Sequence, residues 1–308
     1  METNLSILNN RRKSLIFVGI TQLFWPTNAA ATNLLLGNFT FIQLLFFNCI
    51  AAVSILCLIT LITGKFHLLS NYRISDLPRL VFMSTSGILV YLLFLYKAYT
   101  ITDTQTAYIL QRIWPIFVII FSMFILNEKL QKWHIIGFTF CFLGSTILIG
   151  GFSLDVFTTQ RELFGILLAL IAGMSYGLYS TMGKKFNEDR VTTMLIYYFI
   201  ALLFLLPMVL IENTQLPPIK PMDLFGFLWV GGLILAIGDL SWFLALKYGD
   251  TDKMASISFL SPVLALFWID ILLDEKIRVS SFFGMIVILI GIYMVQNDSN
   301  KLKHADQA

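Results

Sequence analysis

Charged residues are scarce in this chain of 308 residues. Only 13% of them are Asp, Glu, Lys or Arg, whereas a soluble domain carries about 25%. Hydrophobic residues make up 57%, and the mean hydropathy is +0.81. A chain this apolar cannot cover its surface with polar groups, so we expect a lipid bilayer around it. The net charge is only +3 and no basic cluster is present, which argues against nucleic acid as a partner.

Histidine and cysteine are also rare. The three histidines, His67, His134 and His304, lack the spacing of a paired-histidine metal site, and the chain has neither a glycine-rich phosphate loop nor a Ser–His–Asp set. The three cysteines lie in apolar runs and are expected to be buried as small hydrophobic residues. The sequence therefore predicts no enzyme, no metal site and no cofactor.

The apolar residues form ten runs. We place ten transmembrane helices near residues 14–32, 41–63, 78–98, 103–126, 132–150, 162–183, 191–211, 223–246, 252–273 and 279–296. Most of these runs reach the ~20 residues that a helix needs to cross ~30 Å of hydrocarbon. The first run lacks a small-residue cleavage site after it, so we interpret it as a retained helix. The polar tail, residues 297–308, is expected to be disordered and cytoplasmic.

One motif occurs twice at a fixed offset of 147 residues. Each copy has an apolar helix with a proline, a Glu-Lys turn and an apolar helix with two glycines. Seven positions are identical: Asp103, Thr104, Pro115, Glu128, Lys129, Gly137 and Gly144 recur as Asp250, Thr251, Pro262, Glu275, Lys276, Gly284 and Gly291. This repeat predicts two homologous halves, which we place at residues 14–150 and 162–296.

The distribution of basic residues predicts the orientation. With the N-terminus in the cytoplasm, the inner segments hold fifteen Lys and Arg residues and the outer segments hold five. The positive-inside rule therefore predicts a protein of the inner (cytoplasmic) membrane with both termini cytoplasmic. Because five spans per half is an odd number, the second half enters the membrane inverted. The predicted fold class is an all-α polytopic membrane protein with ten transmembrane helices in two inverted five-helix repeats.

Inverted repeats indicate a mechanism. Each half can lean on the other in two mirror-related ways, so that one central site opens to either side of the membrane, as in secondary transporters. Three prolines in the spans, Pro26, Pro115 and Pro262, each remove one helical hydrogen bond. We interpret them as helix breaks that line a cavity; the alternative is that they are packing kinks.

These residues lead to a known family. The chain resembles the drug/metabolite transporter superfamily, and within it the ten-helix EamA-type transporters. The resemblance rests on the proline helix that ends in Asn127-Glu128-Lys129 and is followed by Gly137 and Gly144, and on its second copy. Trp25-Pro26 and Tyr176-Gly177 are similar to the aromatic-plus-small position that begins each repeat. The resemblance implies a basket-shaped helical fold with a central cavity, peripheral fifth and tenth spans, and export of small metabolites without ATP.

The fourth span bears some likeness to the aromatic amino-acid exporter branch of this family. That likeness rests on Trp114-Pro115. The chain departs from the branch at Arg112, where an uncharged aromatic residue is expected.

Two charges lie deep in the spans. Arg112 is in the fourth span and Asp239 is in the eighth, and their mates at the 147-residue offset, Phe259 and Leu92, are apolar. A charge at mid-bilayer costs at least ~2.5–3.5 kcal/mol, so it needs a partner or a wet cavity. We interpret Arg112 as a binding group for an anionic part of the substrate and Asp239 as its counter-charge. A purely structural salt bridge is the alternative.

The central cavity is expected to be lined by residues of the broken spans and of the eighth span, namely Trp25, Asn28, Gln111, Arg112, Trp114, Tyr176, Asp239, Trp242 and Ser261. The predicted function is a secondary transporter, most simply an exporter, of a small organic metabolite such as an amino acid or another carboxylate. An importer or exchanger is the alternative, and a channel is the competitor from another class. Proton coupling through Asp239 is an open alternative, and the sequence carries no signal for an oligomeric state.

Overall fold

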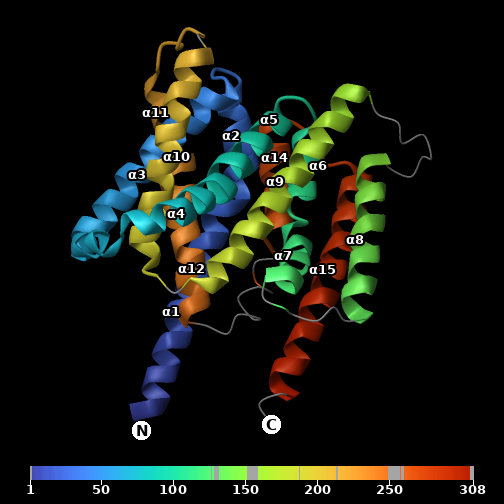
Figure 1. Cartoon of the computed structure of the whole chain (residues 1–308). Helices are drawn as coiled ribbons and strands as arrows, with labels where there is room; N and C mark the ends of the chain where they lie inside the picture. Colours follow the sequence, from blue (N-terminus) through green and yellow to red (C-terminus); the bar gives the residue numbers. More distant parts are fainter. Residues whose placement is uncertain are drawn as a thin grey trace.

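The computed structural model describes residues 2–125, 127, 132–150, 159–186, 188–212, 214–248, 257 and 260–305 (Figure 1). These residues contain helices and no strand, which confirms the all-α fold class. The elements are α1 (Glu2–Phe24), η1 (Trp25–Thr27), α2 (Asn28–Leu36), α3 (Phe41–Ile62), η2 (Lys65–Asn71), η3 (Ile74–Asp76), α4 (Leu77–Ser84), η4 (Thr85–Val90), α5 (Tyr91–Tyr99), α6 (Thr104–Gln111), α7 (Trp114–Ile125), α8 (Lys132–Gly150), α9 (Gln160–Lys185), α10 (Arg190–Glu212), α11 (Pro221–Phe227), η5 (Leu228–Gly238), α12 (Asp239–Tyr248), α14 (Leu260–Leu273) and α15 (Val279–Ala305).

These elements form ten successive hydrophobic segments. Within the described chain, six are long and apolar enough to cross a bilayer: Phe41–Ile62, Ile74–Tyr99, Thr104–Ile125, Gln160–Gly183, Arg190–Glu212 and Pro221–Ala245. Shorter apolar helices cover Ile135–Ser145, Leu260–Leu273 and Val279–Met294. The first segment is the continuous path α1–η1–α2. Both termini lie at the same end of the bundle, as an even number of crossings requires (Figure 1).

Helix ends differ from the prediction at both termini. The first helix begins at Glu2 rather than near residue 14, and α15 continues to Ala305. The expectation of a disordered tail is therefore wrong as far as residue 305, and residues 306–308 lie outside the described structure. The physical reason is that extending an existing helix gains one hydrogen bond per residue fixed, without the cost of nucleation. Good helix formers such as Lys301, Leu302 and Lys303 favour this extension.

The packing of α8 against α15 shows how the two halves are related. A Cβ atom on Gly144 would lie 2.7 Å from the carbonyl oxygen of Gly284, and one on Gly291 would lie 2.5 Å from that of Gly137. The 147-residue offset converts each of these contacts into the other. The glycines therefore allow two antiparallel helices to approach closely around a pseudo-two-fold axis (Figure 1).

Two further observations agree with this axis. The Cys141 thiol donates a hydrogen bond to the carbonyl of its own repeat mate, Ile288, at 3.4 Å. Asn127 and Asp274, which are also repeat mates, both adopt positive φ, at 56° and 52°. Asn and Asp tolerate the left-handed region better than other non-glycine residues, which accounts for their use at this turn. A two-fold axis that relates antiparallel helices lies across them, so the halves are inverted.

Helices α3 and α10 form a second antiparallel pair across the axis. At one end, the Thr40 hydroxyl donates to Glu212 Oε2 at 2.8 Å. At the other end, Lys65 Nζ lies 2.5 Å from Asp189 Oδ2. Burial acts to raise the pKa of the Asp189 carboxyl, but the Lys65 ammonium and backbone N–H groups outweigh it and lower that pKa. Both ends of this pair therefore join the first half to the second.

The third span of each half contains a π-helical segment, η4 in the first and η5 in the second. A π-helix shifts the helical hydrogen bonds from i→i+4 to i→i+5, and such segments occur often at functional sites. Hydroxyl groups of other spans donate to carbonyls of these segments: Ser175 donates to Ser86, Thr21 to Gly238 and Tyr198 to Leu235, at 2.7, 3.2 and 3.3 Å. The bonds to Leu235 and Gly238 hold the end of η5, after which α12 begins at Asp239.

Candidate functional site

Two of the predicted helix breaks lie beside the candidate site. The first span changes to a 3₁₀ turn at Trp25–Thr27, which contains Pro26. The fourth span is interrupted between Gln111 and Trp114, so that Arg112 caps α6 and Pro115 lies in the first turn of α7. Pro262 lies in the first turn of α14. Residues 258 and 259, which precede α14, are outside the described structure, so the predicted break there is not described.

Arg112 is held by neutral groups. Its Nη2 donates to the Tyr108 hydroxyl at 2.6 Å and to the Ser261 hydroxyl at 3.4 Å, and its Cζ lies 4.8 Å from the centroid of the Tyr108 ring. Its Nε is buried and has no hydrogen-bond partner among the described residues. Ser261 belongs to the second half and Arg112 to the first, so this contact joins the halves. The guanidinium therefore retains a donor and its full charge for another group.

Asp239 is also surrounded by neutral donors. Its Oδ1 accepts a hydrogen bond from Trp25 Nε1 at 2.8 Å, and its Oδ2 lies 3.5 Å from the Tyr198 hydroxyl, whose one proton it shares with the Leu235 carbonyl. Part of the surface of Asp239 remains accessible. A carboxylate with two neutral donors keeps its negative charge uncompensated at short range.

Trp25 separates the two charges. Its indole N–H bonds to Asp239, and the Arg112 Cζ lies 5.6 Å from its ring centroid. No ion pair within 4.0 Å joins Arg112 to Asp239, and both residues are described. The two side chains therefore form no direct salt bridge in this conformation, and the role of Asp239 as counter-charge stays a prediction. The indole of Trp25 contacts both charged groups: its ring faces the Arg112 guanidinium, and its N–H donates to the Asp239 carboxylate.

A second group of residues adjoins Arg112 through Gln111. The Gln111 amide donates to the Tyr91 hydroxyl at 3.4 Å, and the Tyr91 ring lies 4.8 Å from that of Tyr176. Trp114 meets Tyr176 edge-to-face at 5.2 Å. Trp114 and Tyr176 are partly accessible, whereas Gln111 is buried. The result is a group of three aromatic rings that is joined to the chain neighbour of Arg112, Gln111.

The aromatic contacts repeat across the two halves. Trp25 of the first span packs on Trp242 of the eighth at 5.6 Å, just as Tyr176 of the sixth packs on Tyr91 of the third. These pairs are related by an offset of 151 residues rather than 147, because the second half has four fewer residues between Trp242 and Asp250 than the first has between Tyr91 and Asp103. The repeat mate of Asp239 is therefore Ile88, not Leu92. Ile88 is also buried and apolar, so the charge still belongs to one half only.

The structure brings together eight of the nine residues proposed from the sequence. Trp25, Arg112, Asp239, Trp242 and Ser261 are joined by the contacts given above, and Gln111, Trp114 and Tyr176 form the adjoining group. Asn28 lies one helical turn after Trp25 and is buried, and its Oδ1 accepts a hydrogen bond from Thr32 of its own helix. Residues 251–256 and 259 of the ninth span, including the repeat mate Phe259, lie outside the described structure.

Three tyrosines at the site are absent from the sequence-based set. Tyr108 holds Arg112, Tyr198 donates to Asp239, and Tyr91 joins Gln111 to Tyr176. Tyr108 could have been found, because it precedes Arg112 by four residues and so shares its helix face. Tyr91 and Tyr198 carry no such signal, since each is a tyrosine in an apolar run.

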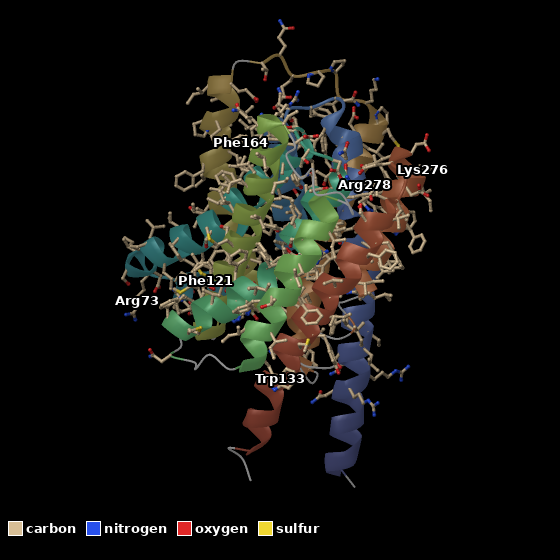
Figure 2. The ribbon with its side chains drawn as sticks, turned by 90° about the vertical axis from the view of Figure 1, so that its right-hand side faces the viewer. Arg73, Phe121, Trp133, Phe164, Lys276 and Arg278 are labelled. Atoms are coloured by element: carbon tan, nitrogen blue, oxygen red, sulfur yellow. The ribbon has the colours of Figure 1, made fainter. Side chains whose placement is uncertain are left out.

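At the end of the bundle remote from both termini, the start of α6 is fastened to the loop between α14 and α15. Gln105 is fully buried, and its amide donates to the carbonyls of Glu275 and Lys276 at 3.2 and 2.8 Å. The Arg278 guanidinium donates to Asp103 and Thr106 at 2.9 and 2.8 Å. We call these residues (Asp103, Gln105, Thr106, Glu275, Lys276 and Arg278) the α6 clasp. Figure 2 shows Lys276 and Arg278 at this end and Trp133 toward the other.

The charged and aromatic site is assembled from seven of the ten segments, and none of the contacts given above involves a described side chain of α8 or α15. Figure 1 shows these two helices together at one edge of the bundle, as expected for the fifth and tenth spans. A polytopic helical bundle with inverted halves and an unpaired cation beside broken helices is a membrane transporter in its architecture.

Comparison with known proteins agrees with this class. The model of the EamA-like transporter family matches the chain twice, at residues 12–150 and 163–296. The chain belongs to this family, and with it to the drug/metabolite transporter superfamily.

Relatives match long stretches of the chain, and one solved structure shares its fold. An uncharacterized transporter of Clostridium kluyveri is 25% identical over 94% of each chain, and the uncharacterized transporter YoaV of Bacillus subtilis is 28% identical over 75% of this chain and 76% of its own. The aromatic amino acid exporter YddG of Ancylobacter novellus is 25% identical over 58% of this chain and 62% of its own. A solved crystal structure with 18% identity superposes with a TM-score of 0.67 over 94% of this chain and 98% of that chain, which shows the shared fold.

Proposed function

We propose that this protein is a secondary transporter that exports a small organic carboxylate, and that Arg112 binds the carboxylate group. The observation that carries the proposal is the state of the Arg112 guanidinium, whose Nε has no hydrogen-bond partner among the described residues. A buried guanidinium is expected to have an anionic partner. A carboxylate can satisfy two of its N–H groups at once, in bidentate geometry.

The surroundings of Arg112 support an organic anion over an inorganic one. Trp25 and Tyr108 flank the planar group of Arg112. The partly accessible rings of Trp114 and Tyr176 belong to the adjoining group, which Tyr91 joins to Gln111. Aromatic side chains of this kind bind apolar or planar parts of a ligand, while a few polar groups fix its orientation. An amino acid is one member of this class, and the name of the relative YddG supports it and also supports export.

The pseudo-two-fold axis supports alternating access. The two halves contact each other between Arg112 and Ser261, at the break of the fourth span. They also contact each other at the α6 clasp, at one end of the bundle. We propose that the clasp closes the outer side in this conformation. A carrier of this design needs no ATP, because the gradients of its ligands drive the exchange.

The proposed function is tested by counterflow in proteoliposomes. Purified protein should exchange a labelled carboxylate against the same unlabelled compound in a saturable manner, and that carboxylate should raise the melting temperature of the protein. The matched control is the amide of the same compound, which keeps the shape and lacks the charge, so it should neither exchange nor stabilise. Equal exchange of acid and amide would contradict a carboxylate site, and unitary conductance would favour a channel.

The proposed orientation is tested by cysteine labelling. Asn38 and Gln215 are exposed at the end that we assign to the outer side, so cysteines introduced there should react with a membrane-impermeant maleimide in intact cells. A cysteine in place of Asn187, in the connection between the sixth and seventh spans, should stay unlabelled until the membrane is opened. Labelling at position 187 in intact cells, without labelling at 38 and 215, would reverse the assignment of cytoplasmic termini.

A further inference from the structure

Among the described residues, Trp25 alone contacts both charges of the site. Its indole N–H lies 2.8 Å from Asp239 Oδ1, and its ring centroid lies 5.6 Å from the Arg112 Cζ. Trp25 is itself buried, packed against Trp242 with the two rings tilted by 46°, and placed on the 3₁₀ turn that breaks the first span. A side chain fixed in this way transmits a change at one charge to the other.

The groups around Asp239 suit a proton better than a metal ion. Both carboxylate oxygens accept hydrogen bonds from neutral donors, and a metal ion would have to displace these donors. A hard cation such as Na⁺ or Ca²⁺ also requires several oxygen ligands. Two nearby carbonyls, those of Leu235 and Gly238, already accept from hydroxyl groups. The described residues contain no cluster of three or more His, Cys, Asp or Glu side chains that could hold a metal.

Among the residues that the structure describes, one cation and several phenols surround Asp239. The cation is Arg112, on the far side of Trp25, and the titratable groups that sense the Asp239 charge are Tyr91, Tyr96, Tyr176, Tyr179 and Tyr198. A tyrosine phenol is neutral at physiological pH, because its ordinary pKa is about 10. Asp239 is therefore the group in this set that can change its charge there.

We propose that Asp239 is a proton-binding site that is coupled, through the indole of Trp25, to the anion site at Arg112, so that a proton and a carboxylate bind together. The proposal rests on the proposed function for its second ligand. Protonation adds one H⁺ from water to a carboxylate oxygen and makes no other bond. It removes the negative charge that partly balances Arg112 and weakens the acceptor of the Trp25 N–H. Arg112 then holds a carboxylate more tightly, and loss of the proton promotes release.

The proton site can be tested without knowledge of the substrate. Infrared difference spectroscopy of the protein in lipid nanodiscs should show the C=O stretch of a protonated carboxylic acid that disappears as the pH is raised. Asp239→Asn should remove this band. Trp25→Phe keeps an aromatic ring and loses the N–H, so the ionised carboxylate loses its shortest donor and the titration midpoint should move to higher pH by about one unit.

The controls separate the indole donor from general effects of mutation. Trp229→Phe removes an indole N–H of the same kind, which donates to the Thr27 hydroxyl at 2.9 Å, and should leave the midpoint unchanged. Tyr198→Phe removes the longer of the two bonds to Asp239, at 3.5 Å, and should move the midpoint upward by less than Trp25→Phe. Arg112→Gln should also move it upward, because the ionised carboxylate loses its nearest cation.

Two outcomes would overturn the proposal. One is a titrating band that survives Asp239→Asn, and the other is a Trp25→Phe midpoint equal to that of the wild type. If Asp239→Asn does not fold, the shifts in Trp25→Phe and Arg112→Gln still decide the question. None of these measurements uses a substrate, so a failure of the carboxylate counterflow assay would leave the proton site standing, and a failed titration would leave the carboxylate site standing.

Discussion

Replacing Arg112 by Gln should abolish counterflow of the carboxylate substrate and leave a folded protein in the membrane. The reason is that Gln keeps N–H donors for Tyr108 and Ser261 but loses both the positive charge and the planar guanidinium that can bind two carboxylate oxygens at once. Hydrogen bonds to a charged group contribute about 1.5–3 kcal/mol each, so the loss of one or two should weaken carboxylate binding by at least about 10-fold. The measurement is the dissociation constant in nanodiscs together with counterflow in proteoliposomes.

Arg112→Lys separates the contribution of the planar guanidinium, with its paired N–H donors, from that of the positive charge. Lysine keeps the positive charge as a compact ammonium but cannot bind both carboxylate oxygens in the guanidinium geometry. It should therefore retain the melting temperature better than it retains carboxylate affinity. Arg190→Gln is the matched control, because Arg190 is also an arginine in this bundle but donates to the backbone carbonyls of Gly183 and Phe186. It should leave carboxylate affinity unchanged.

A double substitution tests the structural alternative for the two charges. If Arg112 and Asp239 served only to neutralise each other through Trp25, Arg112→Leu combined with Asp239→Leu would restore both stability and transport. We expect the double variant to regain stability without transport. Recovered transport in that variant would end the role of Arg112 in binding.

The fold class follows from the sequence because it depends on quantities that a sequence contains. Low charge content identifies the bilayer as solvent, and runs of about 20 apolar residues give the spans. The repeat of Glu128-Lys129 as Glu275-Lys276 gives the two halves. Proline positions gave the breaks beside Trp25 and Arg112, because a proline cannot complete the helical hydrogen bonds whatever surrounds it.

The contacts within the site depend on how each helix is rotated about its own axis, and this rotation cannot be read from the sequence. Asp239 meets Trp25 rather than Arg112 because η5 is wound as a π-helix and sets where α12 begins its turn. The sequence therefore left open whether the two charges pair, and the structure places the indole of Trp25 in contact with both. Tyr91 and Tyr198 were missed for the same reason, since a tyrosine in an apolar helix becomes a site residue only once its neighbours are placed.

Cross-linking the α6 clasp should stop transport reversibly. Gln105 and Glu275 are in direct contact, with the Gln105 backbone N–H donating to Glu275 Oε1 at 3.3 Å and its amide donating to the Glu275 carbonyl. Gln105 lies seven residues before Arg112, about 10 Å along the fourth span at 1.5 Å per residue. If alternating access opens the bundle at this end, α6 must separate from the loop between α14 and α15 in every cycle.

The test uses a protein in which Cys49, Cys57 and Cys141 are replaced by Ala and the pair Gln105→Cys, Glu275→Cys is introduced. Oxidation, or a short bifunctional thiol reagent, should reduce counterflow by more than about 10-fold, because a covalent link costs far more to break than the hydrogen bonds of the clasp. A reductant should restore transport of the disulfide form. The matched control is Thr159→Cys with Glu162→Cys, a pair within one turn at the start of α9 that should oxidise without effect. Thiol titration shows that each link has formed, and full counterflow by the linked clasp would mean that this end of the bundle does not open during transport.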